Sequence, residues 1–259
     1  MMGGSLARPP FFLILCPMAS DWENQIKAQI KRRYSRQIKN KGLGYKNPKE
    51  LGYPVNLIDN LPPILVTQYS GCGYLFDNTY FDGTEKVLDL GSGIGLDSYI
   101  ASTFISTGKV FSLDMTYEVL SDHNTHKINP ICADMEYLPI ENCCVNIILA
   151  NASFNLSINK ERAFNEAYRV LKNSGRLIMR DIIKVKELPQ EILIDPLSFN
   201  TSLGGAIDEL SLKSKLGKAG FVDIIVSDRQ AFSYVESVKI EAVKPSNLPG
   251  FPIQRNNEL

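Results

Sequence analysis

The chain has 259 residues, of which 44% are apolar and 22% are charged, and its 28 basic and 28 acidic side chains leave no formal net charge. This length suits one large α/β domain with some additions. The balanced charge disfavours long-range attraction to nucleic acid or to anionic lipid, so we expect neither nucleic acid nor membrane as a partner. No oligomeric state is predicted.

Residues 1–19 are predicted to be a disordered extension, with Met18 as an alternative start. The apolar run at 11–16 is shorter than the roughly 20 residues that span a bilayer, and shorter than the apolar core of a signal peptide. The chain has five cysteines and no C-x-x-C pair. Such usage is typical of reduced thiols, so we expect a cytoplasmic protein without a metal site.

The next segment, 20–80, is interpreted as an N-terminal helix and lid region. Ser20 and Glu23 fit a capping box that opens a helix. Apolar side chains then recur along one stripe, and the basic ones are expected to be solvated; the stripe is Trp22, Ile26, Ile30, Tyr34 and Ile38, and the basic set is Lys27, Lys31, Arg32 and Arg33. Residues 40–63 are rich in Gly, Pro and Asn, which predicts a long excursion that serves with the helix as a lid.

Strand and helix alternate over the following part, which we assign as one domain at 81–245, with a fraying tail at 246–259. Apolar runs predict parallel strands at 87–90, 110–113, 131–133, 145–150 and 176–179. Helices are predicted at 96–104 and at 160–171, the second stopped by Asn173-Ser174-Gly175. A helix closed by Gly220 precedes two strands, 221–226 and 235–243.

These elements predict an α/β fold. We expect a Rossmann-like, mostly parallel sheet with helices on both faces and an antiparallel C-terminal strand pair at its edge.

The first strand runs into a glycine turn, Gly91-Ser92-Gly93-Ile94-Gly95, just before a helix. Such a turn lets a nucleotide-like ligand lie against bare backbone. By itself it fits NAD, FAD or S-adenosylmethionine. The spacing G-x-G-x-G differs from the pyrophosphate-binding G-x-G-x-x-G, and the closing strand pair replaces a second mononucleotide half. Both features favour S-adenosylmethionine.

Polar residues end the predicted strands, which is where open α/β sheets bind ligands; they are Asp89, Asp114, Asp134, Asn151 and Asp181. Asp114 has the spacing from Gly91 at which an acid accepts hydrogen bonds from both ribose hydroxyls. Asp134, beside Met135, is placed to accept from the exocyclic amine of adenine. Asp89 is expected to hold the glycine turn through backbone amides, or to face a cationic amine. Taken singly, each is also explained as a solvated carboxylate or a helix cap.

With these motifs the chain resembles class I S-adenosylmethionine-dependent methyltransferases over about residues 21–245. The segments that carry the resemblance are VLDLGSGIGLD at 87–97, SLDMT at 112–116, ICADMEYLP at 131–139 and EAYRVLKNSGRLIMRD at 166–181. Within that class it is most similar to the arsenite methyltransferase branch, through the Asp-Met-Thr at 114–116, YSGCG at 69–73, NASFNLS at 151–157, LGGA at 203–206 and SVKIEAVKP at 237–245.

The resemblance implies S-adenosylmethionine as cofactor. It places the glycine turn at the methionine and ribose region, Asn151 near the methyl-donor edge, and the 69–72 segment over the methionine end. The implied cofactor-binding set is Tyr69, Gly71, Cys72, Asp89, Gly91, Gly93, Gly95, Asp114, Met115, Asp134, Met135 and Asn151.

The chain departs from the arsenite branch in its thiols. That branch has a cysteine after the Asn of the fourth strand, where this chain has Ala152, and another before the LGGA segment, where it has Ser202. Of the usual set only Cys72 remains, whereas soft trivalent arsenic prefers several thiolates. We therefore expect methyl transfer to an N, O, S or C atom of a small molecule, and not to arsenite.

Candidate residues of the acceptor pocket are Tyr69, Cys72, Asn151, Ser153, Asn155 and Ser202. None of them is assigned as a base, because an amine or thiolate acceptor can arrive unprotonated. Two alternatives stay open. One is a non-catalytic binding or scaffold protein on the same fold, and the other is an NAD-linked oxidoreductase, which the glycine spacing disfavours.

Overall fold

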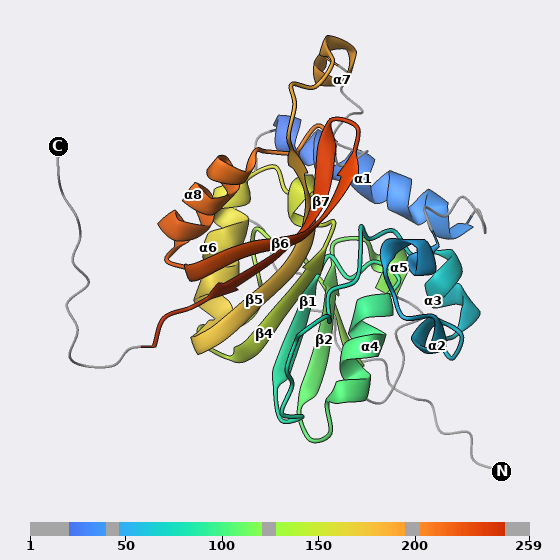
Figure 1. Cartoon of the computed structure of the whole chain (residues 1–259), viewed down its shortest axis with the longest axis vertical. Helices are drawn as coiled ribbons and strands as arrows, with labels where there is room; N and C mark the ends of the chain where they lie inside the picture. The colour runs from blue at the N-terminus through green and yellow to red at the C-terminus, as the bar shows by residue number, and fades with distance from the viewer. Residues whose placement is uncertain (1–20, 40–46, 121–127, 195–202, 247–259) are drawn as a thin grey trace.

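The computed structural model describes residues 21–39, 47–120, 128–194 and 203–246. At its centre is a seven-stranded sheet in the order β3-β2-β1-β4-β5-β7-β6 (Figure 1). The strands are β1 Lys86–Leu90, β2 Lys109–Asp114, β3 Ile128–Cys132, β4 Val145–Asn151, β5 Leu171–Lys184, β6 Val222–Phe232 and β7 Val235–Val243. The first five pair in parallel, and β7 pairs antiparallel with both β5 and β6. The predicted fold class is confirmed.

The helices are α1 Asp21–Lys39, α2 Val55–Ile58, α3 Pro63–Thr67, α4 Leu96–Phe104, α5 Tyr117–Leu120, α6 Lys160–Val170, α7 Gln190–Ile194 and α8 Glu209–Ala219, with short 3-10 turns η1 Pro48–Leu51 and η2 Phe154–Leu156. Successive strand residues point to opposite faces. Leu88 of β1 therefore packs with Phe164 of α6 and Leu216 of α8. Its neighbour Val87 packs with Leu65 of α3 and Ile100 of α4. Helices cover both faces, as predicted.

The helix predicted at about 160–171 is confirmed to within one residue, but the segment predicted to stop it is misplaced. Helix α6 ends at Val170, and Leu171 is already extended, with φ −66° and ψ 138°. Leu171 is fully buried and pairs with Val145 of β4, so burial in the sheet draws the chain out of the helix. The segment 173–175, predicted as the helix stop, lies inside β5 instead.

The region predicted as a long excursion contains short helices where the structure describes it. Residues 47–67 form η1, α2 and α3. Leu51, Ile58 and Leu65 are buried with Val87 and Ile147 of the sheet, so apolar side chains spread among the polar ones anchor this region. Residues 1–20, 40–46 and 247–259 lie outside the described residues, so the N-terminal extension, the capping box at Ser20 and nearly all of the tail are not described.

Helix α1 buries Ile26 and Ile30 as predicted, but Trp22 is 56% exposed. Lys31 and Arg32 are exposed, as expected. The prediction for Lys27 is wrong: its side chain is only 13% exposed and pairs with two carboxylates. The side chain of Ile38 is not described.

Within 21–39, 47–120, 128–194 and 203–246, no helix is both long enough and apolar enough to cross a lipid bilayer.

Candidate functional site

A cleft lies at the carboxyl ends of the parallel strands, roofed on one side by α1. Its large lobe, of about 670 Å³, is lined by the glycine turn, the ends of β2 to β4 and one face of α1. Its small lobe, of about 300 Å³, extends toward α4 and the 69–71 segment. The two lobes share Ser70, Gly91, Gly93 and Asn151, so together they suit an elongated ligand that lies across the glycine turn.

The glycine turn adopts a conformation that only glycine accepts readily. Gly91 has φ +70° and Gly93 has φ +53°, both in the left-handed region. A Cβ on Gly91 would also lie 2.4 Å from the Cβ of Ser153. Gly95, with φ +86°, forms the N-cap of α4. The turn therefore exposes bare backbone to the cleft, as the sequence predicts.

Asp114, rather than Asp89, holds this turn. The backbone amides of Gly91 and Ser92 donate to the carbonyl of Leu113, and the amide of Gly93 donates to Oδ2 of Asp114 at 3.0 Å. The other carboxylate oxygen of Asp114 accepts from the amide of Thr116 at 2.7 Å. Burial raises the pKa of Asp114, and these amides oppose the rise. Its carboxylate lines the large lobe, where the ribose contact stays a prediction.

Asp89 lies instead in the small lobe, where its Oδ2 accepts from the Ser98 hydroxyl at 2.6 Å. The expectation that it binds the turn amides is wrong, because its side chain points toward α4 and the turn is held from β2. Burial, together with the charge of Asp97, raises the pKa of Asp89 to about 8. Two buried carboxylates in one lobe favour a cationic ligand.

Asp97 is a site residue that the sequence analysis missed. Burial raises the pKa of Asp97 to about 6, and hydrogen bonds from Tyr53 and Asn151 oppose the rise. The Tyr53 hydroxyl donates to Asp97 Oδ1 at 2.6 Å and contacts the hydroxyl of Tyr69 at 2.7 Å. An acid in the first turn of the helix that follows a glycine turn was the available signal. No sequence signal indicated the role of Tyr53, because this residue lies in a segment far from Asp97 in the chain.

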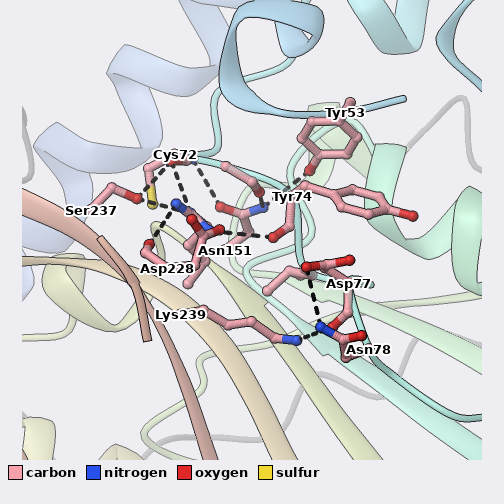
Figure 2. Close-up of polar contacts among 12 residues, drawn as sticks. Tyr53, Cys72, Tyr74, Asp77, Asn78, Asn151, Asp228, Ser237 and Lys239 are labelled. Atoms are coloured by element: carbon pink, nitrogen blue, oxygen red, sulfur yellow. Dashed lines mark hydrogen bonds and ion pairs between the residues drawn. The ribbon is translucent and has the colours of Figure 1, made fainter. Parts of the chain in front are cut away.

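Asn151 joins the small lobe to the 72–73 segment. Its Oδ1 accepts from the amide of Cys72 at 2.8 Å, and its Nδ2 donates to the carbonyl of Gly73 at 2.8 Å. The same amide nitrogen reaches Asp97 Oδ2 at 2.8 Å and the hydroxyl of Tyr69 at 2.9 Å. Figure 2 shows Asn151 beneath Cys72, with Tyr53 on one side. The structure thus brings Tyr69, Gly71 and Asn151 to one lobe, as predicted.

Arg180 holds the same segment from the neighbouring strand, and the sequence analysis missed it. It is the register partner of Asn151, and its side chain is fully buried. Its Nε donates to the Ser237 hydroxyl at 3.0 Å and to the carbonyl of Cys72 at 3.3 Å. The guanidinium also pairs with Asp228, which Figure 2 places beside Ser237. An arginine within an apolar strand gave no sign of partners so far away in sequence.

The other predicted acceptor residues do not gather in one place. Ser153 lines the large lobe, with its hydroxyl donating to the carbonyl of Leu90 at 2.7 Å. Asn155 lies at a separate small cavity beside Lys160, and its side-chain Nδ2 donates to the backbone carbonyl of Ile182 at 2.7 Å. Ser202 falls outside the described residues. Cys72 is buried, and burial raises the pKa of its thiol to about 12.

Asp181 is buried but does not end a strand, because β5 continues to Lys184. Oδ2 of Asp181 accepts from the backbone amide of Asn155 at 3.0 Å, and burial raises the pKa of Asp181 to about 6. The carboxylate therefore fixes the 154–155 turn against β5, and its predicted strand-end placement is wrong.

The adenine-side candidates Met115, Asp134 and Met135 all line the large lobe. Asp134 is not free there. Its Oδ2 accepts from Lys27 Nζ at 2.7 Å, and its Oδ1 accepts from the amide of Glu136 at 2.9 Å. Among the residues for which the structure gives positions, no group of three or more His, Cys, Asp and Glu side chains could hold a metal ion.

Comparisons with known proteins agree with this architecture. The sequence matches a protein family described as a methyltransferase domain over residues 81–220. It is 30% identical over 184 residues to an arsenite methyltransferase of Halobacterium salinarum, covering 62% of this chain and 47% of that protein. It is also 30% identical over 200 residues to an arsenite methyltransferase of Aquipseudomonas alcaligenes, covering 71% of this chain and 57% of that protein.

An X-ray structure of an arsenic(III) S-adenosylmethionine methyltransferase from Chlamydomonas reinhardtii superposes with a TM-score of 0.63 and 26% identity, covering 75% of this chain and 73% of that one. The chain spans about half the length of the curated relatives it matches.

Proposed function

This chain belongs to the methyltransferase domain family, and we propose that it transfers a methyl group from S-adenosylmethionine to a small-molecule acceptor. The observation that carries the proposal is the two-lobed cleft, in which a glycine turn separates an acidic small lobe from a larger lobe lined by methionines. The division into 20–80 and 81–245 and the cytoplasmic location stay predictions.

The residues of the cleft fit this donor. The small lobe offers Asp89 and Asp97 to the cationic amino-acid end. The left-handed glycines let the backbone approach the ligand, and Asp114 supplies the acceptor for ribose hydroxyls. When bound, S-adenosylmethionine supplies a methyl group on a positively charged sulfur.

The chain's own contribution is alignment and exclusion of water. Asn151 holds the 72–73 segment over the small lobe through bonds to Cys72 and Gly73. Ile30 and Tyr34 of α1 and Leu156 of η2 supply apolar side chains to the lining of the large lobe. We assign no general base, since alignment of a nucleophilic acceptor is sufficient for this transfer.

We propose further that arsenite is not the acceptor, although the relatives reported above are named for it. Ala152 follows Asn151, so the strand end carries no thiol there. Cys72 is buried, and a single thiol offers one sulfur ligand where a soft metalloid prefers several. An acceptor atom of N, O, S or C is compatible with the cleft.

The proposal is tested in two steps. Calorimetry with S-adenosylmethionine and S-adenosylhomocysteine is expected to show binding, and mass spectrometry to detect either molecule in the purified protein. No affinity and no copurifying ligand would favour a non-catalytic binding protein on this fold. The second step incubates the protein with methyl-labelled S-adenosylmethionine and a metabolite pool, and separately with arsenite and a thiol. We expect a labelled metabolite and no methylarsenical; efficient arsenic methylation would overturn the exclusion.

A further inference from the structure

Lys27, a basic residue of helix α1, pairs with two carboxylates of the cleft. Its Nζ lies 2.7 Å from Asp134 Oδ2 and 2.7 Å from Glu136 Oε2. The side chain is 13% exposed and lines the large lobe, whereas Lys31, one helical turn later, is exposed.

Glu136 is fixed independently of Lys27. Its Oε1 accepts from the Ser157 hydroxyl at 2.9 Å and from the amides of Ile158 and Asn159 at 2.9 and 3.0 Å. Asp134 is likewise oriented by the amide of Glu136. Both carboxylates therefore stand in defined positions at the wall of the large lobe, and Lys27 is held between them.

A count of hydrogens shows what this arrangement offers a ligand. An ammonium group has three N–H donors, and the two ion pairs use two of them. Asp134 presents carboxylate oxygen beside this ammonium. The wall of the lobe thus offers an acceptor and a donor side by side.

Adenine presents the complementary pair, because its exocyclic amine donates and the ring nitrogens on either side of that amine, N1 and N7, accept. We propose that Lys27 binds the methyl donor directly. Its ammonium group donates a hydrogen bond to the adenine ring nitrogen next to the exocyclic amine, and that amine donates to Asp134. Helix α1 then takes part in nucleobase recognition as well as covering the cleft. This inference rests on the proposed function.

The competing interpretation is that Lys27 only fastens α1 to Asp134 and Glu136. A fastening role predicts that replacing Lys27 weakens every ligand of the cleft by the same factor. Direct contact predicts that the loss is confined to ligands that carry the ring nitrogen. Ligand analogues lacking one nitrogen separate the two.

The test measures the affinity of the full chain for S-adenosylhomocysteine and for its 1-deaza and 7-deaza analogues by calorimetry. For the wild type we expect one analogue to bind about tenfold more weakly than S-adenosylhomocysteine, the loss that follows from removing a hydrogen bond to a charged group. Lys27→Met is expected to bind S-adenosylhomocysteine about tenfold more weakly and to make no distinction among the three ligands. Arg32→Met, at an exposed position on another side of the same helix, is expected to match the wild type.

Equal affinity of the wild type for all three ligands would overturn the proposal, as would a Lys27→Met variant that keeps the wild-type preference. If thermal melting shows Lys27→Met to be unfolded, Lys27→Gln is measured in its place, and a retained preference counts against the proposal in the same way. A wild type that does not bind S-adenosylhomocysteine at all would instead refute the proposed function, so the two failures are distinguishable.

Discussion

Replacing Asp89 by asparagine is expected to stabilise the unliganded protein and to weaken its binding of S-adenosylmethionine. The Asp89 carboxyl is 1% exposed, and one of its oxygens accepts from the Ser98 hydroxyl at 2.6 Å. Burial and the nearby charge of Asp97 raise its pKa to about 8 from an ordinary value of 3.8. Asparagine has the same shape and carries no charge to bury.

The direction of the expected stability change follows from proton binding to Asp89. Between about pH 4 and 8 the folded protein keeps the Asp89 proton while the unfolded chain has lost it, so the stability of the wild type falls as the pH rises through this window. One pKa unit corresponds to 1.36 kcal/mol, which makes the destabilisation about 4 kcal/mol near pH 7. A buried amide N–H without a new partner costs about 1 kcal/mol. We therefore expect Asp89→Asn to gain about 3 kcal/mol.

The assay is urea denaturation of wild type and variant at several pH values between about 5 and 8. The gain is expected to shrink toward the acid end, because there the unfolded chain also begins to take up the proton. Asp223→Asn, an exposed position on β6, is the control and is expected to leave stability unchanged. Calorimetry is expected to show about tenfold weaker binding of S-adenosylmethionine to Asp89→Asn, because asparagine cannot release a proton and pair as a carboxylate with the ammonium group of the ligand. A variant less stable than wild type at about pH 8, or a pH profile parallel to wild type, would refute the reasoning.

Three further variants test the rest of the site. Asp114→Ala is expected to weaken S-adenosylhomocysteine binding at least about tenfold, and unchanged affinity in calorimetry would remove the ribose contact. Gly91→Ala places a Cβ 2.4 Å from the nearest side-chain carbon at φ +70°, so thermal melting is expected to show a loss of about 1–3 kcal/mol; Gly217→Ala, with nothing within 4 Å, is expected to be neutral or slightly stabilising. Asp228→Asn leaves the fully buried Arg180 without its carboxylate, and we expect a loss of about 2 kcal/mol by urea denaturation, with Asp223→Asn again as the control; equal stability of the two would show that the ion pair contributes nothing.

Local sequence was sufficient for the centre of the fold. Helix α4 at 96–104 and strand β7 at 235–243 have the predicted bounds, and the other strands lie within a few residues of theirs, apart from the extended β5 and β6. The apolar run predicts a buried strand, and the glycines after it permit the positive φ values that the turn requires. The segment 173–175 was misassigned as a helix stop because burial of Leu171 in the sheet starts β5 before it, and that burial depends on a strand elsewhere in the chain.

The glycine turn, Asp114 and Asn151 were found from sequence because each follows a strand, and parallel strands bring their carboxyl ends to one edge. Which side chains complete the site depends on tertiary structure. Arg180 meets Ser237, and Lys27 meets Asp134, across long stretches of chain. The same charged residue is solvated or buried according to the segment that packs against it, and no local pattern contains that information. The sequence by itself therefore determined the fold and the turn at which the cleft forms. The burial of charged side chains in the cleft and their ion-pair and hydrogen-bond partners were decided only when distant segments packed together.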